Sequence, residues 1–225
     1  TGISNAMLRG VRRVRYERLQ KAFPECTRTN ARGRIRLMAN LALSTPLGRE
    51  VLRKLHAGQE VELSGVVYTA RDAAHQRLAA ALEAGRELPL ELSGATIYYC
   101  GPAPAPPGRP VGSCGPTTSA RMDVYMEALL TQGLAATIGK GNRSEDVRRA
   151  LMRYGAVYFV AVGGAGALLA THVTRCRVVA YEDLGPEAIY EFALDRFPLL
   201  VAYDTHGGTV FAGEGLIDAE HPART

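Results

Sequence analysis

The chain has 225 residues, of which 47% are hydrophobic and 22% are charged. These fractions are typical of a folded globular protein and exclude a chain that is disordered over most of its length. The longest apolar stretch, residues 156–170, is interrupted by glycines and is shorter than the roughly 20 residues of a membrane-spanning helix. The sequence therefore predicts no transmembrane segment.

The net charge of +5 is concentrated near the N-terminus. Residues 1–40 contain ten Lys or Arg side chains and two acids, whereas the remaining 185 residues contain 17 basic and 20 acidic side chains. The basic arm fits a solvated extension or a contact with a polyanion, and it gives no argument for nucleic-acid binding by the rest of the chain. A nucleic-acid-binding protein that uses the arm is kept as an alternative.

The first 37 residues are set apart from the rest. Residues 1–6, before Met7, are interpreted as an expression scar, and residues 7–37 as a basic N-terminal extension. An Arg-rich organelle presequence is an alternative for the same segment. Ordinary patterned sequence begins at Met38, so we expect one domain over residues 38–225.

The four cysteines lie at positions 26, 100, 114 and 176. None belongs to a CxxC motif or to a Cys–His ligand pair, so the sequence predicts no metal site in this chain. Because no export signal is evident, we expect reduced thiols in a cytoplasmic protein.

The first half of the domain begins with Pro46–Leu55, whose apolar residues on one face predict a helix. The alternating, β-branched residues of Glu60–Thr69 predict a strand, and the Ala-rich Asp72–Ala84 predicts a helix. A short strand is expected over Thr96–Cys100. It is followed by a Pro- and Gly-rich loop over residues 101–115.

From residue 96 onward, predicted strands and helices alternate. The expected helices cover residues 118–133, 144–154, 163–171 and 187–195. The expected strands cover residues 135–138, 156–162, 176–181 and 199–203, with an edge strand over 210–217. The alternation predicts an α/β fold with a largely parallel central sheet covered by helices. The segment 60–100 departs from this rhythm, so a second sheet layer is expected there.

Three turns carry residues suited to binding an anion. Arg71 precedes a helix whose first N–H groups are free, and His75 lies one turn further. An arginine binds a carboxylate through two N–H donors, and a histidine supplies a hydrogen bond. Next, Gly115–Asp123 places hydroxyls and Arg121 at a helix start. Third, Lys140 lies between two glycines after a buried strand, at the strand end where open α/β sheets bind ligands.

Each turn alone also fits an ordinary role: a surface ion pair, a packed core histidine, a helix cap or a surface turn. The lysine turn lacks the spacing of a P-loop, and the glycines at 163–166 lack that of a dinucleotide loop. Three cationic or donor-rich turns in one domain favour a single compact anion. A small dicarboxylate fits better than a nucleotide, because no base-binding or metal–phosphate residues are evident.

Five motifs, in chain order, resemble those of one family. They are Ala70–His75, Gly115–Asp123, Gly139–Ser144, Tyr158–Gly166 and Asp183–Ala188. Over roughly residues 40–213 the chain is similar to the beta subunit, equivalent to the C-terminal domain, of class I iron–sulfur fumarate hydratases and L(+)-tartrate dehydratases. The resemblance implies a swivelling β/β/α three-layer domain, which would make residues 38–225 a fumarase beta-type catalytic domain.

The same resemblance implies a hydro-lyase that hydrates fumarate reversibly to (S)-malate. It implies a [4Fe-4S] cluster ligated by an alpha subunit rather than by this chain, and a higher-order oligomer such as an alpha2-beta2 assembly. The proton donor to the leaving hydroxyl would also belong to the alpha subunit. The isolated chain is therefore expected to be folded and inactive.

The resemblance further implies roles for seven residues. Thr117 and Lys140 would be catalytic, with Thr117 as the base at substrate C3. The expected substrate-binding residues are Arg71, Arg121, Thr118, His75 and Asp123. A threonine hydroxyl is a poor base in water, so cationic groups such as Lys140 have to stabilise its alkoxide.

The substrate is the least determined part of this interpretation. Gly139–Ser144 and Arg121–Asp123 look more like fumarate hydratases, whereas Asp204–Gly207 looks more like tartrate dehydratases. Fumarate is favoured, with a tartrate dehydratase beta subunit as the alternative. A non-catalytic anion-binding or assembly module is a further alternative.

Overall fold

The computed structural model describes residues 41–211 and 213, so the predictions for residues 1–37 lie outside the described residues. The chain divides into two units, residues 1–39 and 40–225, and the fold below is that of the second unit. Of the predicted tail strand 210–217, position 212 and positions 214–217 also lie outside the described residues.

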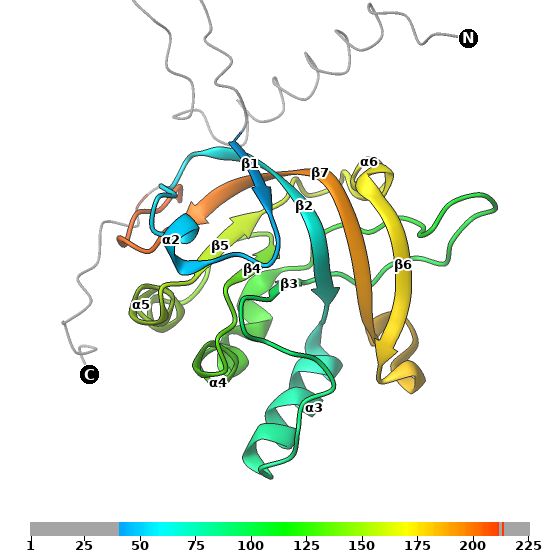
Figure 1. Ribbon diagram of the computed structural model, residues 1–225, viewed down its shortest axis with the longest axis horizontal. Helices are drawn as coiled ribbons and strands as arrows, with labels where there is room; N and C mark the ends of the chain where they lie inside the picture. The colour runs from blue at the N-terminus through cyan, green and yellow to red at the C-terminus, as the bar shows by residue number, and fades with distance from the viewer. Residues whose placement is uncertain (1–40, 212, 214–225) are drawn as a thin grey trace, which may run out of the picture. The chain divides into compact units, whose positions relative to one another are not determined.

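One sheet runs through the domain (Figure 1). Five strands pair in parallel, each with the next: β1 (Leu41–Ser44), β2 (Glu60–Thr69), β3 (Thr96–Tyr98), β4 (Ala136–Gly139) and β5 (Val157–Val160). The long strand β7 (Ile189–Tyr203) pairs antiparallel with β2, with β5 and with β6 (Val173–Ala180). Because β7 joins β5 to β2, the strands β2, β3, β4, β5 and β7 close into a barrel-like ring.

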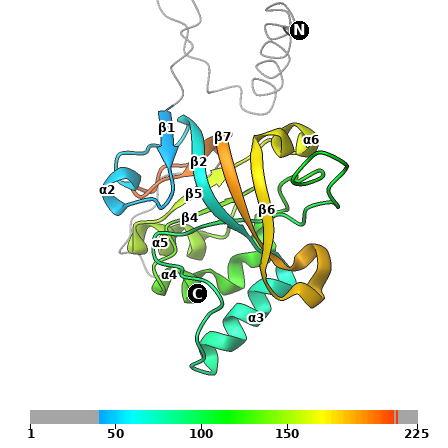
Figure 2. The same ribbon diagram turned by 45° about the vertical axis from the view of Figure 1, so that its right-hand side comes forward.

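The helices are short except for two. They are α2 (Arg49–Leu52), α3 (Asp72–Glu83), α4 (Met126–Thr131), α5 (Glu145–Tyr154) and α6 (Gly166–Leu169), with 3-10 segments η2 (Ser119–Tyr125), η3 (Ala170–His172) and η4 (Glu182–Glu187). In both views, α3, α4 and α5 lie together on one side of the sheet (Figures 1 and 2). No helix in the described ranges is long and apolar enough to cross a membrane.

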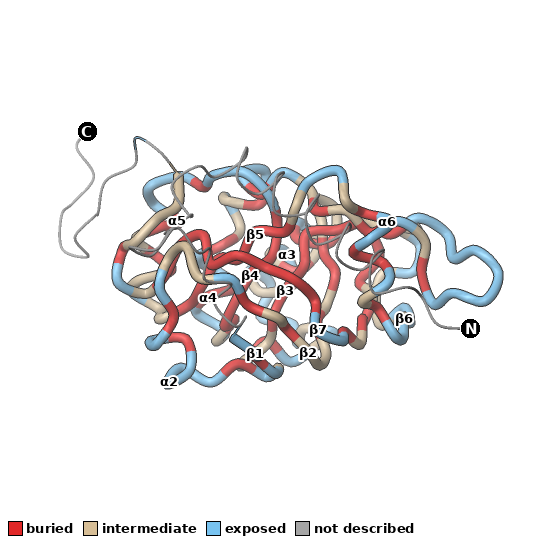
Figure 3. Tube along the Cα trace, turned by 90° about the horizontal axis from the view of Figure 1, so that it is seen from above, coloured by how far each residue is buried: buried red, intermediate tan, exposed pale blue. Residues whose placement is uncertain are grey.

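The core lies inside the ring and between the sheet and these helices. The side chains of Tyr98, Phe159, Phe192 and Phe197 are fully buried, and the Tyr98 and Phe197 rings meet edge to face with centroids 5.5 Å apart. Figure 3 shows buried residues following the strands, whereas residues 103–110 form an exposed loop. Burial of each such aromatic side chain stabilises the fold by about 1.5–3 kcal/mol.

Local sequence explains where α5 begins and ends. The Ser144 hydroxyl caps the helix by accepting a hydrogen bond from the Val147 N–H at 3.4 Å, and two acids follow in the first turn. Gly155 ends the helix in the left-handed conformation, with φ of 66°. This helix therefore starts directly after the turn that carries Lys140.

The predicted α/β class is confirmed, but the sheet is mixed rather than largely parallel. Four of its strand pairings are parallel and three, all made by β7, are antiparallel. The predicted helix 187–195 is wrong, because most of it lies in β7. There the backbone bonds to β2 on one side and to β6 on the other, and this pairing outweighs local helix propensity.

Other predicted elements differ in extent. The segment 60–100 forms no second sheet layer, since β2 and β3 belong to the one sheet. The helix predicted over 118–133 is a 3-10 segment followed by the short α4, and the helix predicted over 46–55 is reduced to α2.

Candidate functional site

The carboxyl ends of β2, β3, β4 and β5 meet at one edge of the sheet, as parallel strands must. Pairing continues past the strands: the Ala70 N–H donates to the Tyr98 carbonyl at 3.1 Å, and the Tyr99 N–H donates to the Ile138 carbonyl at 2.8 Å. The Ala161 N–H likewise donates to the Gly139 carbonyl at 2.9 Å. This edge carries all three turns singled out in the sequence.

Thr117 and Lys140 lie side by side because their backbones are hydrogen-bonded. The Thr117 N–H donates to the Tyr99 carbonyl at 2.7 Å, and the Lys140 N–H donates to the Thr117 carbonyl at 3.2 Å. The Ser119 N–H donates back to the Lys140 carbonyl at 3.0 Å, which makes Thr118 and Lys140 partners in an isolated parallel bridge. Thr117 and Thr118 thus pair beside the end of β4, directly before η2 begins at Ser119.

Gly139 permits this close approach. A Cβ atom there would overlap the Ser119 hydroxyl and lie 2.9 Å from Cδ2 of Tyr99. Any side chain would therefore push the segment that carries Thr117 away from the turn that carries Lys140.

Arg71 and Arg121 approach each other around one carboxylate. Nη2 of Arg121 lies 3.0 Å from Oδ2 of Asp72, and Nη2 of Arg71 lies 3.9 Å from the same oxygen and 3.4 Å from Oε1 of Glu187. Both guanidinium groups are partly exposed, so an incoming carboxylate can compete for their N–H donors. Nε of Arg71 is buried and has no hydrogen-bond partner among the described residues.

The Lys140 side chain is exposed and runs past Gly163, where an added Cβ would lie 3.7 Å from Cδ of the lysine. Within residues 41–211 and 213, its ammonium group has no ion-pair or hydrogen-bond partner. Thr117 is half-buried and Thr118 is exposed. A cation without an internal partner is available to an anionic ligand, because no competing carboxylate has to be displaced.

His75 is fully buried beneath this edge. Its Nδ1–H donates to the Arg71 carbonyl at 2.9 Å, and its ring packs against Tyr99 and Tyr125. Burial lowers the pKa of His75 to about 4, and the hydrogen bond to Arg71 only partly offsets that effect. The imidazole is therefore neutral near pH 7, and its contact with Arg71 is through the backbone; its predicted role in substrate binding stays a prediction.

Asp123 makes its contacts inside the chain, and 12% of its side chain is exposed. Its Oδ1 accepts a hydrogen bond from Nε of Arg143 at 2.5 Å, and its Oδ2 accepts one from the Ser144 N–H at 2.7 Å. Both carboxylate oxygens are thus used inside the chain, and its predicted contact with substrate stays a prediction. Arg143 was not assigned a role from sequence, although it lies three residues after Lys140 in the same motif and directly before the cap of α5.

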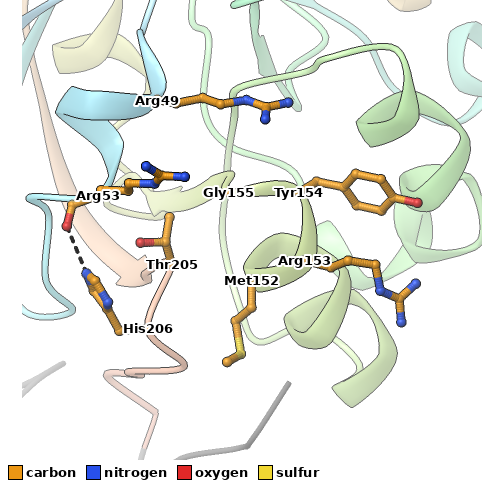
Figure 4. A pocket seen from close by; sticks show the side chains of 8 residues that line it. All are labelled: Arg49, Arg53, Met152, Arg153, Tyr154, Gly155, Thr205 and His206. Atoms are coloured by element: carbon orange, nitrogen blue, oxygen red, sulfur yellow. Dashed lines mark hydrogen bonds between the residues drawn. The ribbon is translucent and has the colours of Figure 1, made fainter. Parts of the chain in front are cut away.

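A separate cavity of about 260 Å³ lies at the opposite edge of the sheet, where the parallel strands begin (Figure 4). It is lined by Arg49, Arg53, Met152, Arg153, Tyr154, Gly155, Thr205 and His206. In Figure 4 the side chains of Arg153 and Tyr154 point away from Arg53 and His206, and both bond to Glu127 instead. None of the seven predicted site residues lines this cavity.

Potential metal ligands are not gathered at either edge. Over residues 41–211 and 213, no group of three or more His, Cys, Asp or Glu side chains could hold a metal ion. Cys100 and Cys114 are buried and Cys176 is partly buried, all with free thiols. These residues do not fit the ligand set of an iron–sulfur cluster.

Comparison with known proteins gives a consistent group of relatives. The family model described as "Fumarase C-terminus" matches residues 11–214, so the match begins inside the segment set apart as an N-terminal extension. "Fumarate hydratase class I, anaerobic" from Escherichia coli is 37% identical over 174 residues, which are 75% of this chain and 32% of that protein. "Fumarate hydratase 1, mitochondrial" from Leishmania major is 36% identical over 177 residues, which are 78% of this chain and 32% of that protein.

A shorter relative is matched over most of its length. "Putative L(+)-tartrate dehydratase subunit beta" from Methanocaldococcus jannaschii is 39% identical over 171 residues, which are 73% of this chain and 88% of that protein. This chain therefore spans about a third of the length of the fumarate hydratases it matches, but nearly the whole of the subunit-sized relative.

Proposed function

The chain belongs to the Fumarase C-terminus family, and from this premise we propose that it is the beta subunit of a hydro-lyase that interconverts fumarate and (S)-malate. The observation that carries the proposal is the backbone pairing that sets Thr117 beside Lys140, at the edge where Arg71 and Arg121 converge. The fold between residues 38 and 225 would be the swivelling domain of that enzyme.

The four side chains divide into two tasks. Arg71 and Arg121 bind the substrate carboxylates, exchanging their contacts with Asp72 and Glu187 for charge-assisted bonds to the ligand. Thr117 and Lys140 act on the carbon chain. In the direction of dehydration, Thr117 as its alkoxide takes the proton from C3 of malate and becomes the neutral hydroxyl. The C3–H electron pair forms the C2–C3 double bond, and the C2 hydroxyl leaves as water with a proton from a donor outside this chain. Loss of the Thr117 proton to water restores the alkoxide for the next turnover.

The Thr117 hydroxyl needs help to act as a base, because its pKa in water is far above neutrality. Lys140 lies across the bridge from Thr118, the next residue, and its ammonium group has no partner among the described residues. Its positive charge lowers the cost of forming the alkoxide. Such help is strongest at a site from which the bound substrate excludes water.

The class I fumarate hydratases are iron–sulfur enzymes, and the described residues of this chain do not fit a cluster. We therefore assign the [4Fe-4S] cluster and the proton donor to an alpha subunit. An alpha2-beta2 assembly is the proposed form of the complex, and the beta-subunit name of the Methanocaldococcus relative supports a partner chain.

A tartrate dehydratase is the second candidate, supported by the length of that relative. The motif Asp204–Gly207 does not strengthen it. Asp204 accepts hydrogen bonds from the N–H groups of Ala57, His206 and Gly208, each at 2.8 Å. It follows the end of β7, which runs antiparallel to β5, and so it lies at the edge away from Thr117. The contacts of Asp204 shape a turn, and a role of this motif in substrate choice stays a prediction.

The test is anaerobic co-expression with the alpha subunit, reconstitution of the cluster, and parallel assays of fumarate, (S)-malate and L(+)-tartrate. Thr117→Ala is the test variant, and Thr171→Ala, an exposed threonine on η3, is the matched control. We expect malate–fumarate turnover that is lost in Thr117→Ala and kept in Thr171→Ala. Turnover of tartrate alone would replace the substrate, and a cluster-loaded complex inactive on all three compounds would overturn the proposal.

A further inference from the structure

The geometry points to Arg143 as a positioning residue that holds the Thr117 and Lys140 segments in register with Arg121. This inference rests on the proposed function, because it concerns the same site. Arg143 itself touches none of the surfaces open to substrate: its side chain is 0% exposed. Its action is therefore through the residues that it contacts.

Arg143 contacts side chains of η2, β4 and β5, and of Tyr99, which directly follows β3. Its Nε donates to Asp123 in η2, and its Nη1 lies 3.4 Å from the Thr137 hydroxyl in β4. Its guanidinium lies over the rings of Tyr99 and Tyr158, at 5.3 and 5.2 Å from their centroids. A planar cation stacked on two rings and bonded at its edge has little freedom to turn.

Asp123 links Arg143 to the segment that contains Arg121. One oxygen of its carboxylate accepts a hydrogen bond from Nε of Arg143, and the other accepts one from the Ser144 N–H. These bonds connect η2 to the start of α5. Arg121 lies two residues before Asp123 in the same 3-10 segment. A shift of Arg143 therefore moves the backbone that places the Arg121 guanidinium.

A hydrogen-bond chain beside Arg143 fixes the turn of Lys140. The Gly141 carbonyl only accepts, so the Tyr158 hydroxyl donates to it at 2.8 Å. The Ser119 hydroxyl then donates to Tyr158 at 2.8 Å and accepts the Lys140 N–H at 3.1 Å. Because Arg143 covers the Tyr158 ring, removing the guanidinium frees that ring and loosens the chain around Lys140.

The arrangement is costly as a means of stability alone. The Arg143 side chain is fully buried, and its Nη2 has no hydrogen-bond partner among the described residues. Replacing a buried ion pair by apolar or neutral residues of similar size is often neutral for stability. The Arg143–Asp123 pair is present in spite of this cost, which fits a role in positioning the site residues. The experiment therefore measures stability and catalysis separately.

The experiment uses the reconstituted complex with the double variant Arg143→Met/Asp123→Asn. Asn at 123 keeps an oxygen for the Ser144 N–H, and Met fills the volume between the two rings. The control is Arg153→Met/Glu127→Gln, which removes an exposed ion pair with 57% and 61% of its side chains accessible. Three quantities are measured: the thermal unfolding midpoint, kcat and KM for malate and fumarate, and the affinity for succinate, an unreactive dicarboxylate.

We expect the double variant to unfold within a few degrees of the wild type while kcat falls at least tenfold and succinate binds several-fold more weakly. Small displacements of reacting groups cost this much in rate. The control pair should match the wild type in all three measurements. Arg143→Lys, which keeps the charge but loses the stacked fork, should fall between wild type and double variant, and it provides the same comparison if the double variant unfolds.

The outcomes separate the two proposals. A wild-type complex with turnover and a double variant that is equally active overturn the positioning role and leave the proposed function intact. Loss of activity that only follows loss of the folded state, in both the Met and the Lys variants, also overturns it. A wild-type complex that neither binds succinate nor turns over any dicarboxylate overturns the proposed function first, and the inference with it.

Discussion

The two edges of the sheet are both rich in arginine, but they hold their charges in different ways. At the edge of Lys140, the guanidinium of Arg143 is 0% exposed and its partner Asp123 is 12% exposed. At the cavity edge, Arg53 is 63% exposed and pairs with Glu50 at 3.4 Å, and Arg153 pairs with Glu127 on the surface. Cationic residues alone therefore do not identify a site.

The difference lies in what supports the charge that faces solvent. Lys140 is exposed but projects from a turn fixed by buried hydrogen bonds, so the backbone that carries it is defined before any ligand arrives. The cavity arginines are exposed along their length and make solvent-screened pairs worth about 0–1 kcal/mol. A charge carried on a fixed backbone needs less reorganisation to stabilise a transition state, and among the described residues of the two edges Lys140 has this support.

The largest expected effect comes from breaking the buried pair on one side only. Asp123→Ala leaves the Arg143 guanidinium buried without a carboxylate, which should lower the free energy of unfolding by about 3–5 kcal/mol. The matched change at the other edge, Glu127→Ala, should stay within about 0.5 kcal/mol. Urea unfolding of the two variants measures both values, and equal losses would remove the distinction between the edges.

Next in size is the effect on catalysis of the exposed lysine. Lys140→Ala should lower kcat of the complex by about 10²–10³-fold, as expected for the loss of one preorganised charge at a reacting centre. Its unfolding midpoint should not change, because the side chain is exposed. Arg53→Ala, which removes another exposed cation, at the cavity, should keep the wild-type kcat. A comparable loss in Arg53→Ala would place the chemistry at the wrong edge.

The smallest effect concerns the buried histidine beneath the site. Because burial lowers the pKa of His75 to about 4, the unfolded chain takes up a proton between pH 6.5 and 4 that the folded chain does not. This group therefore lowers the free energy of unfolding by about 1.4 kcal/mol per pH unit as the pH falls through that window, and contributes no pH dependence above it.

The variant His75→Asn isolates this contribution, because the amide can still donate to the Arg71 carbonyl. Urea unfolding at several pH values between 6.5 and 4.5 should show a shallower slope in His75→Asn than in the wild type. An unchanged slope in His75→Asn would show that this imidazole does not titrate on unfolding.

Sequence patterns predicted the meeting of the three turns but not the way they are held. Turns that follow parallel strands come to one edge by geometry, so Arg71, Thr117 and Lys140 could be grouped without coordinates. The pair Asp123–Arg143 joins residues 20 positions apart through burial, which no local pattern shows. The strand β7 was missed over residues 189–195 because its neighbours, β2 and β6, decide its conformation.

The docking of the Thr117 segment at Gly139 has a consequence for engineering. Thr117 and Lys140 are joined through main-chain atoms, and the tight packing there involves Ser119 and Tyr99 rather than either side chain. Under the proposed function, the side chains at positions 117 and 140 therefore act on the substrate without supporting the fold. A combinatorial library at these two positions would sample new reactivities on an intact scaffold, whereas the same library at 139 would mostly sample misfolded chains.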